Sequence, residues 1–479
     1  MIGEEVLFSG IREIGGHLRA RRLSAVDLAE WSLRRLETIG PRLGAVVTVT
    51  RERALAAAHR ANQEILAGRD RGPLHGIPFG VKDLLATKGI PTTWGAEPLR
   101  GQVFDFDATV VRRLEEAGAV LVAKLAMVEL AGGLGYDNPD ASFTGPGRTP
   151  WNADFWSGGS SSGSAAAVAA GLVAFAIGSE TVGSILTPAA FCGVTGLRPT
   201  YGLVSRHGAM ALSWTLDKLG PIARSADDCA LVLAAVAGPD PEDPTTGETF
   251  RYREHPVKRG RPGHRFRVGV LRHATVGADP DVESRFRDAL SVLRDVADID
   301  DDVPFPDLPF REAAGVIVDG EGASALRDLI ESGKVKQLRD RSDRAGGYAM
   351  LLTRAADYLD AMRARVRMRT ELDALASRYD ALVAPTRLRL APPVGRDLSA
   401  PEPGAPPAPA RDAPRAPATI PAGNLAGLPA IAVPMGFGRD RLPVSLQLIG
   451  RAFSEETLVA LADAYQDMTD WHRQRPPGV

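Results

Sequence analysis

Apolar residues recur along the chain with more than one spacing. A three- and four-residue spacing predicts helices over residues 8–40 and 51–68, and the second of these ends at a glycine. Residues 107–124 follow the order helix, glycine turn and buried strand, and residues 164–179 again lead from a helix into a strand. The β-branched stretch 74–93, interrupted by Pro and Gly, indicates strand and loop. The same criteria predict strands at 266–272, 430–435 and 442–450, and helices at 279–296 and 454–466.

Two segments interrupt this succession of strands and helices. Residues 323–379 are charged and mostly helical in pattern, and residues 391–421 are rich in Pro and Ala, which is typical of an exposed loop. Because strand-like segments lie on both sides, the sequence predicts one large α/β domain over residues 1–479 with insertions. We consider both segments candidate covers of an active site.

Composition narrows the class of protein. Of the 479 residues, 44% are hydrophobic and 24% charged, and the net charge is −2, so we expect a large core and neither nucleic acid nor a membrane as a partner. The N-terminus MIGEEVLFSG shows no signal peptide, and the longest apolar run, 165–178, is shorter than the roughly 20 residues of a membrane span. Cys192 and Cys229 have no metal-type spacing and are expected as buried free thiols. These features favour a soluble, cytoplasmic protein.

Residues 157–164, SGGSSSGS, have the composition of a flexible linker but directly precede the most apolar run. Residues 159–163 also match G-x-S-x-G, the nucleophile elbow of α/β-hydrolases. That elbow needs a preceding apolar strand and a downstream histidine, and the late histidine here is His472, close to the C-terminus. A Ser/His/Asp arrangement using His75 or His207 stays open.

A second serine, Ser184, follows Thr181-Val182-Gly183 at the exit of an apolar strand. A glycine-containing turn at such a place can direct several backbone N–H groups at one point, which stabilisation of an oxyanion requires. An ordinary strand-to-helix turn with Ser184 as N-cap explains the same residues.

The chain resembles the amidase signature family in several motifs that occur in the family's order. These motifs are LHGIPFGVKD (74–83), DATVVRRLEEAGAVLVAK (107–124), GRTPWN, SGGSSSGSAAAVAAG, GSETVGSILTPAAFCGVTGLRPT (178–200), GNLAGLP (423–429) and LPVSLQLIGRAFSEETL (442–458). The resemblance extends from about residue 20 to 465 and is weaker across the two interrupting segments. It implies a single domain with a mixed, mostly parallel central β-sheet covered by helices on both sides.

The resemblance also implies a Ser–cis-Ser–Lys mechanism. Lys82 would be the base, Ser160 the bridging serine and Ser184 the nucleophile that forms the acyl-enzyme. The octet would be a rigid turn with a cis peptide between Gly159 and Ser160, continuing through Ser161. The oxyanion would meet the N–H groups of Thr181, Val182, Gly183 and Ser184.

A lysine base requires a lowered pKa. An unperturbed lysine, with a pKa near 10.4, is protonated at pH 7. Burial of Lys82 against the apolar segment IPFGV would disfavour the ammonium. Only 7 of the 57 basic residues are lysines, and an arginine at position 82 would stay protonated, so the chemistry explains why a lysine is retained.

Three residues depart from the common family pattern: Ser162 and Val182 replace glycines, and Leu186 replaces an arginine. Leu134 and Tyr136 lie where the family has its acyl-side wall. Together with Leu186 they predict a site for a rather apolar or aromatic substrate, although a core position is an equal alternative for Leu186.

Three functions are compatible with these features. The first is a stand-alone hydrolase of small, rather apolar amides, with esters and carbamates (urethanes) as further substrates. The second is the glutamine-hydrolysing A subunit of a tRNA-dependent amidotransferase, and the third is a non-catalytic scaffold. The family resemblance implies no metal and no organic cofactor, and we expect a monomer or homodimer that binds a small molecule.

Overall fold

The computed structural model describes residues 2–252, 265–400 and 414–479. Within these residues, eleven strands form one sheet. The strands follow the order β1-β3-β2-β4-β6-β5-β10-β11-β9-β7-β8 across the sheet. In chain order they are β1 (Val46–Val49), β2 (Pro78–Lys82), β3 (Val120–Leu125), β4 (Phe175–Glu180), β5 (Thr195–Arg198), β6 (Lys218–Ala223), β7 (Phe266–Leu271), β8 (Ala297–Val303), β9 (Ala381–Pro385), β10 (Ala430–Phe437) and β11 (Pro443–Ile449).

The sheet is mixed, as expected, but the prediction that it is mostly parallel is wrong. Among the described strands, β2 pairs in parallel with β3 and β4, and β7 with β8 and β9, whereas the other six pairings are antiparallel. That expectation came from the family resemblance, and the hairpin of β10 and β11 and the antiparallel pair of β5 and β6 do not fit it.

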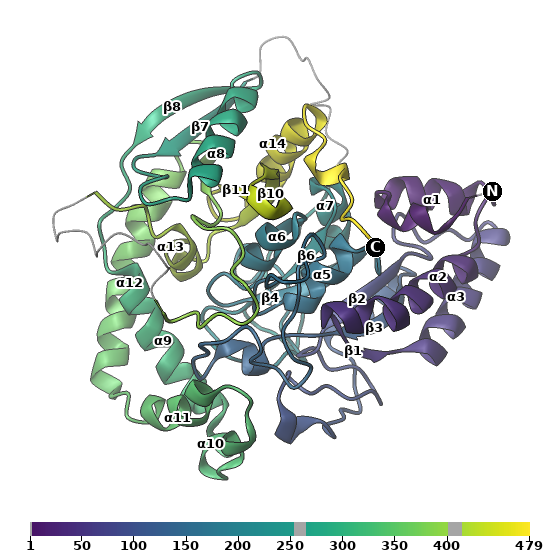
Figure 1. The fold of residues 1–479 in the computed structure, drawn as a ribbon, viewed down its shortest axis with the longest axis horizontal. Coiled ribbons are helices and arrows are strands. Elements are labelled where there is room, and N and C mark those ends of the chain that lie inside the picture. Colours follow the sequence, from purple (N-terminus) through teal and green to yellow (C-terminus); the bar gives the residue numbers. More distant parts are fainter. Residues whose placement is uncertain (1, 253–264, 401–413) are drawn as a thin grey trace.

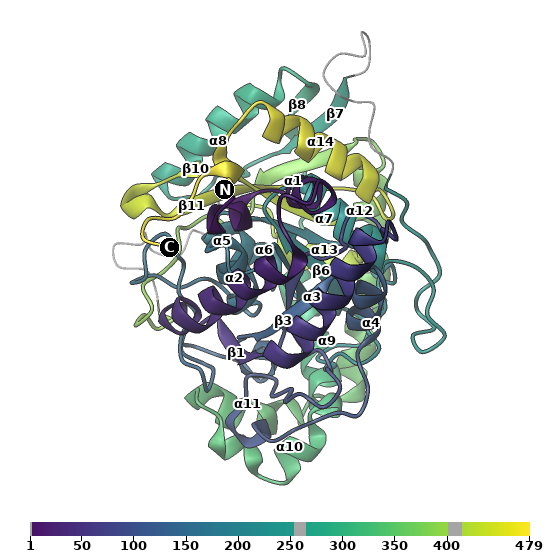
Figure 2. The ribbon, with the colours of Figure 1, turned by 90° about the vertical axis from the view of Figure 1, so that its right-hand side faces the viewer.

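Helices flank the sheet along its length (Figures 1 and 2). They are α1 (Ile11–Arg19), α2 (Ala25–Thr38), α3 (Arg51–Leu66), α4 (Thr109–Glu116), α5 (Ser162–Ala169), α6 (Leu186–Cys192), α7 (Ala226–Val236), α8 (Pro280–Leu293), α9 (Phe310–Ala325), α10 (Arg327–Glu331), α11 (Arg341–Met350), α12 (Ala355–Ala376), α13 (Thr419–Ala426) and α14 (Glu455–Asp467). No helix of the described residues is long and apolar enough to cross a membrane.

Most of the predicted elements are present, with shifted boundaries. The predicted helix over 8–40 is two helices, because Ser24 accepts a hydrogen bond from the Asp27 N–H and thereby caps a separate α2. Strands β1, β5, β6, β8 and β9 were not predicted. The residues of β5, β6 and β9 are buried on both faces, so these strands lack the alternation that marks a half-exposed strand.

The predicted helical segment 323–379 begins earlier, with α9 at Phe310, and continues through α12. Helices α10 and α11 lie together at one end of the molecule in both views (Figures 1 and 2). The predicted loop 391–421 is irregular up to Ala400 and contains the start of α13 near its end, and its residues 401–413 lie outside the described part.

Candidate active site

Lys82 is the last residue of β2 and its side chain is fully buried. Its Nζ lies 2.6 Å from Ser160 Oγ and 2.9 Å from Ser179 Oγ. Ser179 is on β4, the parallel neighbour of β2, so the carboxyl ends of two adjacent strands bring the amine to the serine turn. The structure therefore joins Lys82 and Ser160 as expected and adds Ser179, which sequence reasoning missed.

Burial lowers the pKa of Lys82 to about 7, while the charges of Asp217 and Glu180 act in the opposite direction. A group with this pKa is substantially neutral near pH 7 and can accept a proton. The surroundings of Lys82 thus provide the lowered pKa that a lysine base requires.

The octet 157–164 is a buried turn rather than a linker. The Gly159–Ser160 peptide is cis, as expected from the resemblance. A Cβ on Gly159 would lie 2.8 Å from both Trp156 Cζ2 and Val128 Cγ2, so only glycine leaves room for these side chains. The turn is held in place by a hydrogen bond from the Val128 N–H to the Ser160 carbonyl, 3.1 Å long.

Ser161 connects this turn to the segment that carries Ser184. Its N–H donates to the Ser184 carbonyl at 3.2 Å, and its Oγ donates to the Ser179 carbonyl at 3.2 Å. Ser161 is fully buried, which excludes it as the exposed nucleophile of a G-x-S-x-G elbow. Its contacts give it a structural role between the two serine segments.

The turn 181–184 has a backbone suited to its residues. Gly183 has φ +97°, in the region that favours glycine, whereas Val182 keeps a negative φ that a β-branched residue adopts without strain. Thr181 Oγ1 donates to Asp217 Oδ1 at 2.6 Å, which ties the start of the turn to the neighbouring loop. Ser184 is not an N-cap, because α6 begins at Leu186 after Ile185 and without a side-chain cap.

Glu180, at the end of β4, anchors the other side of this turn. Its Oε2 accepts the N–H groups of Ile185 (2.8 Å) and Leu186 (3.0 Å), and its Oε1 accepts from Arg198 and Asn424. Burial alone would raise the pKa of Glu180, but Arg198, Asn424 and the two N–H groups bring it below its usual value. Sequence reasoning missed this anchor, although Glu180 and Asn424 both occur in the quoted motifs.

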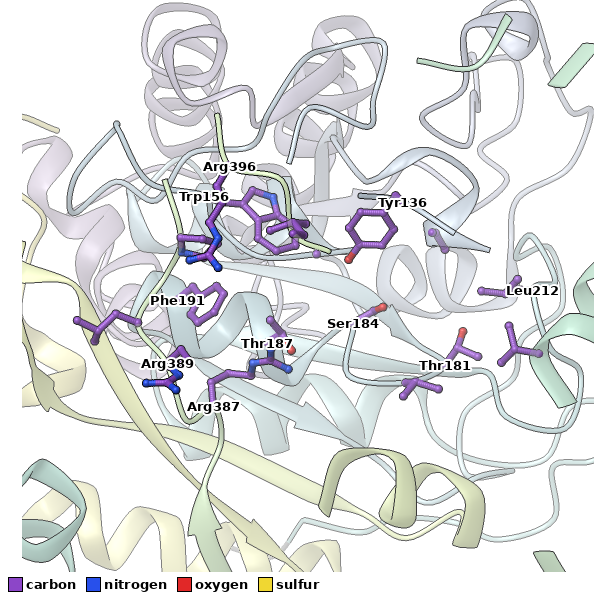
Figure 3. Close-up of a pocket in the computed structure, with 18 of the residues that line it drawn as sticks. Tyr136, Trp156, Thr181, Ser184, Thr187, Phe191, Leu212, Arg387, Arg389 and Arg396 are labelled. Atoms are coloured by element: carbon purple, nitrogen blue, oxygen red, sulfur yellow. The ribbon is translucent and has the colours of Figure 1, made fainter. Parts of the chain in front are cut away.

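Ser184 opens onto a cavity of about 480 Å³ (Figure 3). Thr181, Val182, Thr187 and Leu212 line it near Ser184, and three aromatic rings form another part of its wall. The Tyr136 and Trp156 rings meet edge to face, with centroids 6.2 Å apart, as do Trp156 and Phe191 at 6.4 Å. The remaining lining residues are Ala131, Gly132, Gly159, Val318, Arg387, Arg389, Leu390, Pro392, Arg396, Leu398 and Ala400.

Of the three side chains expected to form the substrate wall, only Tyr136 lines the cavity. Leu134 is buried and packs against Gly347 of α11, and Leu186 is buried in the core at the start of α6. The prediction of Leu134 and Leu186 as wall residues is therefore wrong for this cavity. Three arginines, Arg387, Arg389 and Arg396, were missed, because they lie in a part of the chain without a recognised motif.

The candidate histidines lie elsewhere. His75 is buried beside Glu64 and Asp70, and the ring of His207 stacks on Phe106. Neither they nor His472 line the cavity at Ser184, so a Ser/His/Asp site has no support among the described residues. Cys192 and Cys229 are free and buried, as predicted. No three His, Cys, Asp or Glu side chains of the described ranges gather as a metal site would require.

Comparison with protein families matches residues 27–459 to the family described as amidase. The chain belongs to the amidase family. Among curated relatives, the A subunit of the glutamyl-tRNA(Gln) amidotransferase of Carboxydothermus hydrogenoformans is 36% identical and is covered over 99% of its length by 98% of this chain. The family membership agrees with the resemblance seen in the motifs.

Two solved structures of the family share the fold closely. An inhibitor-bound vestigial protein complex, described as revealing the evolutionary origins of an s-triazine catabolic enzyme, contains a chain with a TM-score of 0.86 at 32% identity, covering 96% of this chain and 98% of that one. The native peptide amidase from Stenotrophomonas maltophilia has a TM-score of 0.82 at 31% identity, covering 99% of both chains. The chain is thus similar over its length to one component of an amidotransferase and to a peptide amidase.

Proposed function

We propose that the chain hydrolyses the C–N bond of a carboxamide through an acyl-enzyme on Ser184. The observation that carries the proposal is the buried amine of Lys82, whose pKa is lowered to about 7, at 2.6 Å from Ser160 Oγ. The Ser160 turn is bonded through Ser161 to the backbone of Ser184, and Ser184 faces the cavity. A base, a bridging hydroxyl and an accessible hydroxyl are the parts that nucleophilic catalysis needs.

In the acylation step, neutral Lys82 accepts the Ser160 proton while Ser160 Oγ accepts the proton of Ser184. Ser184 Oγ bonds to the carbonyl carbon, and the N–H groups of the turn 181–184 stabilise the oxyanion. Collapse breaks the C–N bond, and the relay returns the proton from Lys82 through Ser160 to the leaving nitrogen. Water then attacks the acyl-enzyme, giving up a proton through the same relay, and releases the carboxylic acid and free Ser184.

Esters and carbamates react by the same acyl transfer, and we include them as candidate substrates of the same site. The oxyanion groups in this proposal are the N–H groups of Thr181, Val182, Gly183 and Ser184. Glu180 acts as a positioning residue, because its carboxylate holds the N–H groups that directly follow Ser184.

The second candidate function is the glutamine-hydrolysing component of an amidotransferase. Its support is the 36% identity over 98% of the chain to a protein of that name. Such a component would work with further proteins, so partner proteins belong to this candidate and not to the first.

Ammonia release from purified chain separates the two candidates. We expect the chain alone to release ammonia from simple acyl amides and its Ser184→Ala variant to release none. Turnover of L-glutamine that appears only when another protein co-purifies with the chain would instead favour the amidotransferase candidate. A fluorescent or chromogenic ester measured in parallel tests whether the site also accepts esters.

A further inference from the structure

Among the described residues, the charged side chains that line the Ser184 cavity are all arginines. Arg387, Arg389 and Arg396 line it, and no Asp, Glu or Lys of the described chain does so. A second cavity of about 240 Å³, which shares Val182 with the first, is lined by Arg387, Arg389 and Arg311 and again by no described acidic residue. Cationic side chains concentrated in a concave site raise the local concentration of anions.

Arg387 is the arginine placed best for direct contact with a bound molecule. It follows strand β9, is exposed to the cavity, and borders both cavities. Figure 3 shows its side chain entering the cavity and running toward Thr187, on the side where Ser184 lies. Its guanidinium carbon lies 6.0 Å from the centroid of the Phe191 ring, which limits its position on one side.

No carboxylate of the described residues forms an ion pair with Arg387. The neighbouring charge is that of Arg311, which repels it. The nearby hydroxyl of Tyr136 is neutral, because burial raises its pKa to about 12. The guanidinium of Arg387 stays charged at neutral pH, because arginine is not deprotonated in proteins. A guanidinium beside another cation, and in no ion pair with a carboxylate of residues 2–252, 265–400 or 414–479, is stabilised when a ligand supplies the carboxylate.

We propose that Arg387 binds a carboxylate of the substrate, so that the cavity selects amides carrying a carboxylate a few bonds from the scissile carbonyl. This assignment rests on the proposed hydrolysis at Ser184. Because no acidic residue of the described ranges lines the cavity, an α-ammonium group beside that carboxylate would find no counter-charge among them. The preferred substrates are therefore simple monoamides of dicarboxylic acids rather than amino-acid amides.

Matched substrates test this assignment. Glutaramate carries the carboxylate, glutaramide is its neutral counterpart, and L-glutamine adds the ammonium group. From ammonia release we expect kcat/KM for glutaramate to exceed that for glutaramide and for L-glutamine by at least about tenfold, since sites built for a polar group reject analogues lacking it. Equal values for glutaramate and glutaramide would overturn the assignment.

Variants locate the effect at the guanidinium. Arg387→Gln is expected to lower kcat/KM for glutaramate by at least about tenfold more than kcat/KM for glutaramide, which removes the preference. Arg387→Lys keeps part of the preference, because it keeps the charge but not the bidentate geometry. Arg272→Gln removes a positive charge from the exposed pair with Asp302, away from the lining, and controls for net charge. Equal loss on both substrates in Arg387→Gln would indicate a structural role and contradict the assignment.

A second readout does not need turnover. Glutarate should protect Ser184 of the wild type from a fluorophosphonate at concentrations at least about tenfold lower than in Arg387→Gln, because only the wild type offers the charge-assisted bond. Equal protection of both proteins would contradict the carboxylate assignment. Labelling of Ser184 would in that case still support the proposed hydrolysis. Absence of labelling would be a failure of the proposed function itself, and the carboxylate assignment would fall with it.

Discussion

Lys82 shows how the surroundings of one side chain determine its chemistry. The amine is buried at the end of β2, and the loss of hydration outweighs the attraction of Asp217 and Glu180, so its pKa falls to about 7. An exposed lysine on the same strand would remain protonated and could not take a proton from Ser160. Burial is therefore the feature that converts an ordinary cation into a base.

The pH dependence of the rate follows from this pKa. Because the base must be neutral, kcat/KM should rise with pH through an apparent pKa near 7 and level off above it, with no further gain as pH approaches 10. Lys82→Met should lower kcat/KM by about 10²-fold or more at every pH and remove the rising limb. A profile already flat from pH 5 to 9 in the wild type would show that Lys82 is not the base.

At the scale of elements, Glu180 connects three segments that are distant in sequence. Its carboxylate joins the end of β4 to the start of α6, to Arg198 of β5 and to Asn424 of α13. Glu180 and Arg198 form a fully buried ion pair at 3.0 Å. The turn with Ser184 lies between these contacts, so its shape depends on them.

Glu180→Gln should therefore both destabilise the fold and distort the turn that carries Ser184. Loss of one partner of a buried pair leaves Arg198 charged and unpaired, which costs about 3–5 kcal/mol in the free energy of unfolding. Asp302→Asn, which breaks the exposed pair with Arg272, serves as the matched control. It should change the free energy of unfolding by about 1 kcal/mol or less. Urea unfolding monitored by circular dichroism measures both variants, and equal effects would show that the Glu180 network does not stabilise the fold.

The same elements show what the sequence could and could not predict. Motifs located Lys82, Ser160 and Ser184, and the structure brings Lys82 against Ser160 and the turn of Ser160 against the backbone of Ser184. The buried strands β5, β6 and β9 were missed because they lack alternation, and Leu134 and Leu186 were placed in the wall because position along a motif does not fix the direction of a side chain. Ser179 and Arg387 depend on contacts between distant segments, which a single sequence does not contain.

At the scale of the molecule, strands of the sheet position the catalytic side chains, and segments later in the chain line the cavity in front of them. Val318 of α9 and the stretch 387–400 line the cavity, whereas no residue of the predicted cover 323–379 does so. The start of the Pro/Ala-rich segment is thus part of the wall, through Pro392, Arg396, Leu398 and Ala400. A covering role for the helical segment stays a prediction.

The positive cavity belongs to a molecule whose net charge is only −2. The charge of Arg387 therefore acts locally rather than as part of a general attraction for anions. That arrangement suits recognition of a small anionic substrate at one place and agrees with the assignment of Arg387.

The central claim is that Ser184 is an activated nucleophile, and the most direct test is the intact mass of the protein after treatment with a fluorophosphonate. The account predicts one adduct per chain on the wild type, localised to Ser184, and none on Ser184→Ala. No adduct on the wild type, or an adduct that persists on Ser184→Ala, would contradict it.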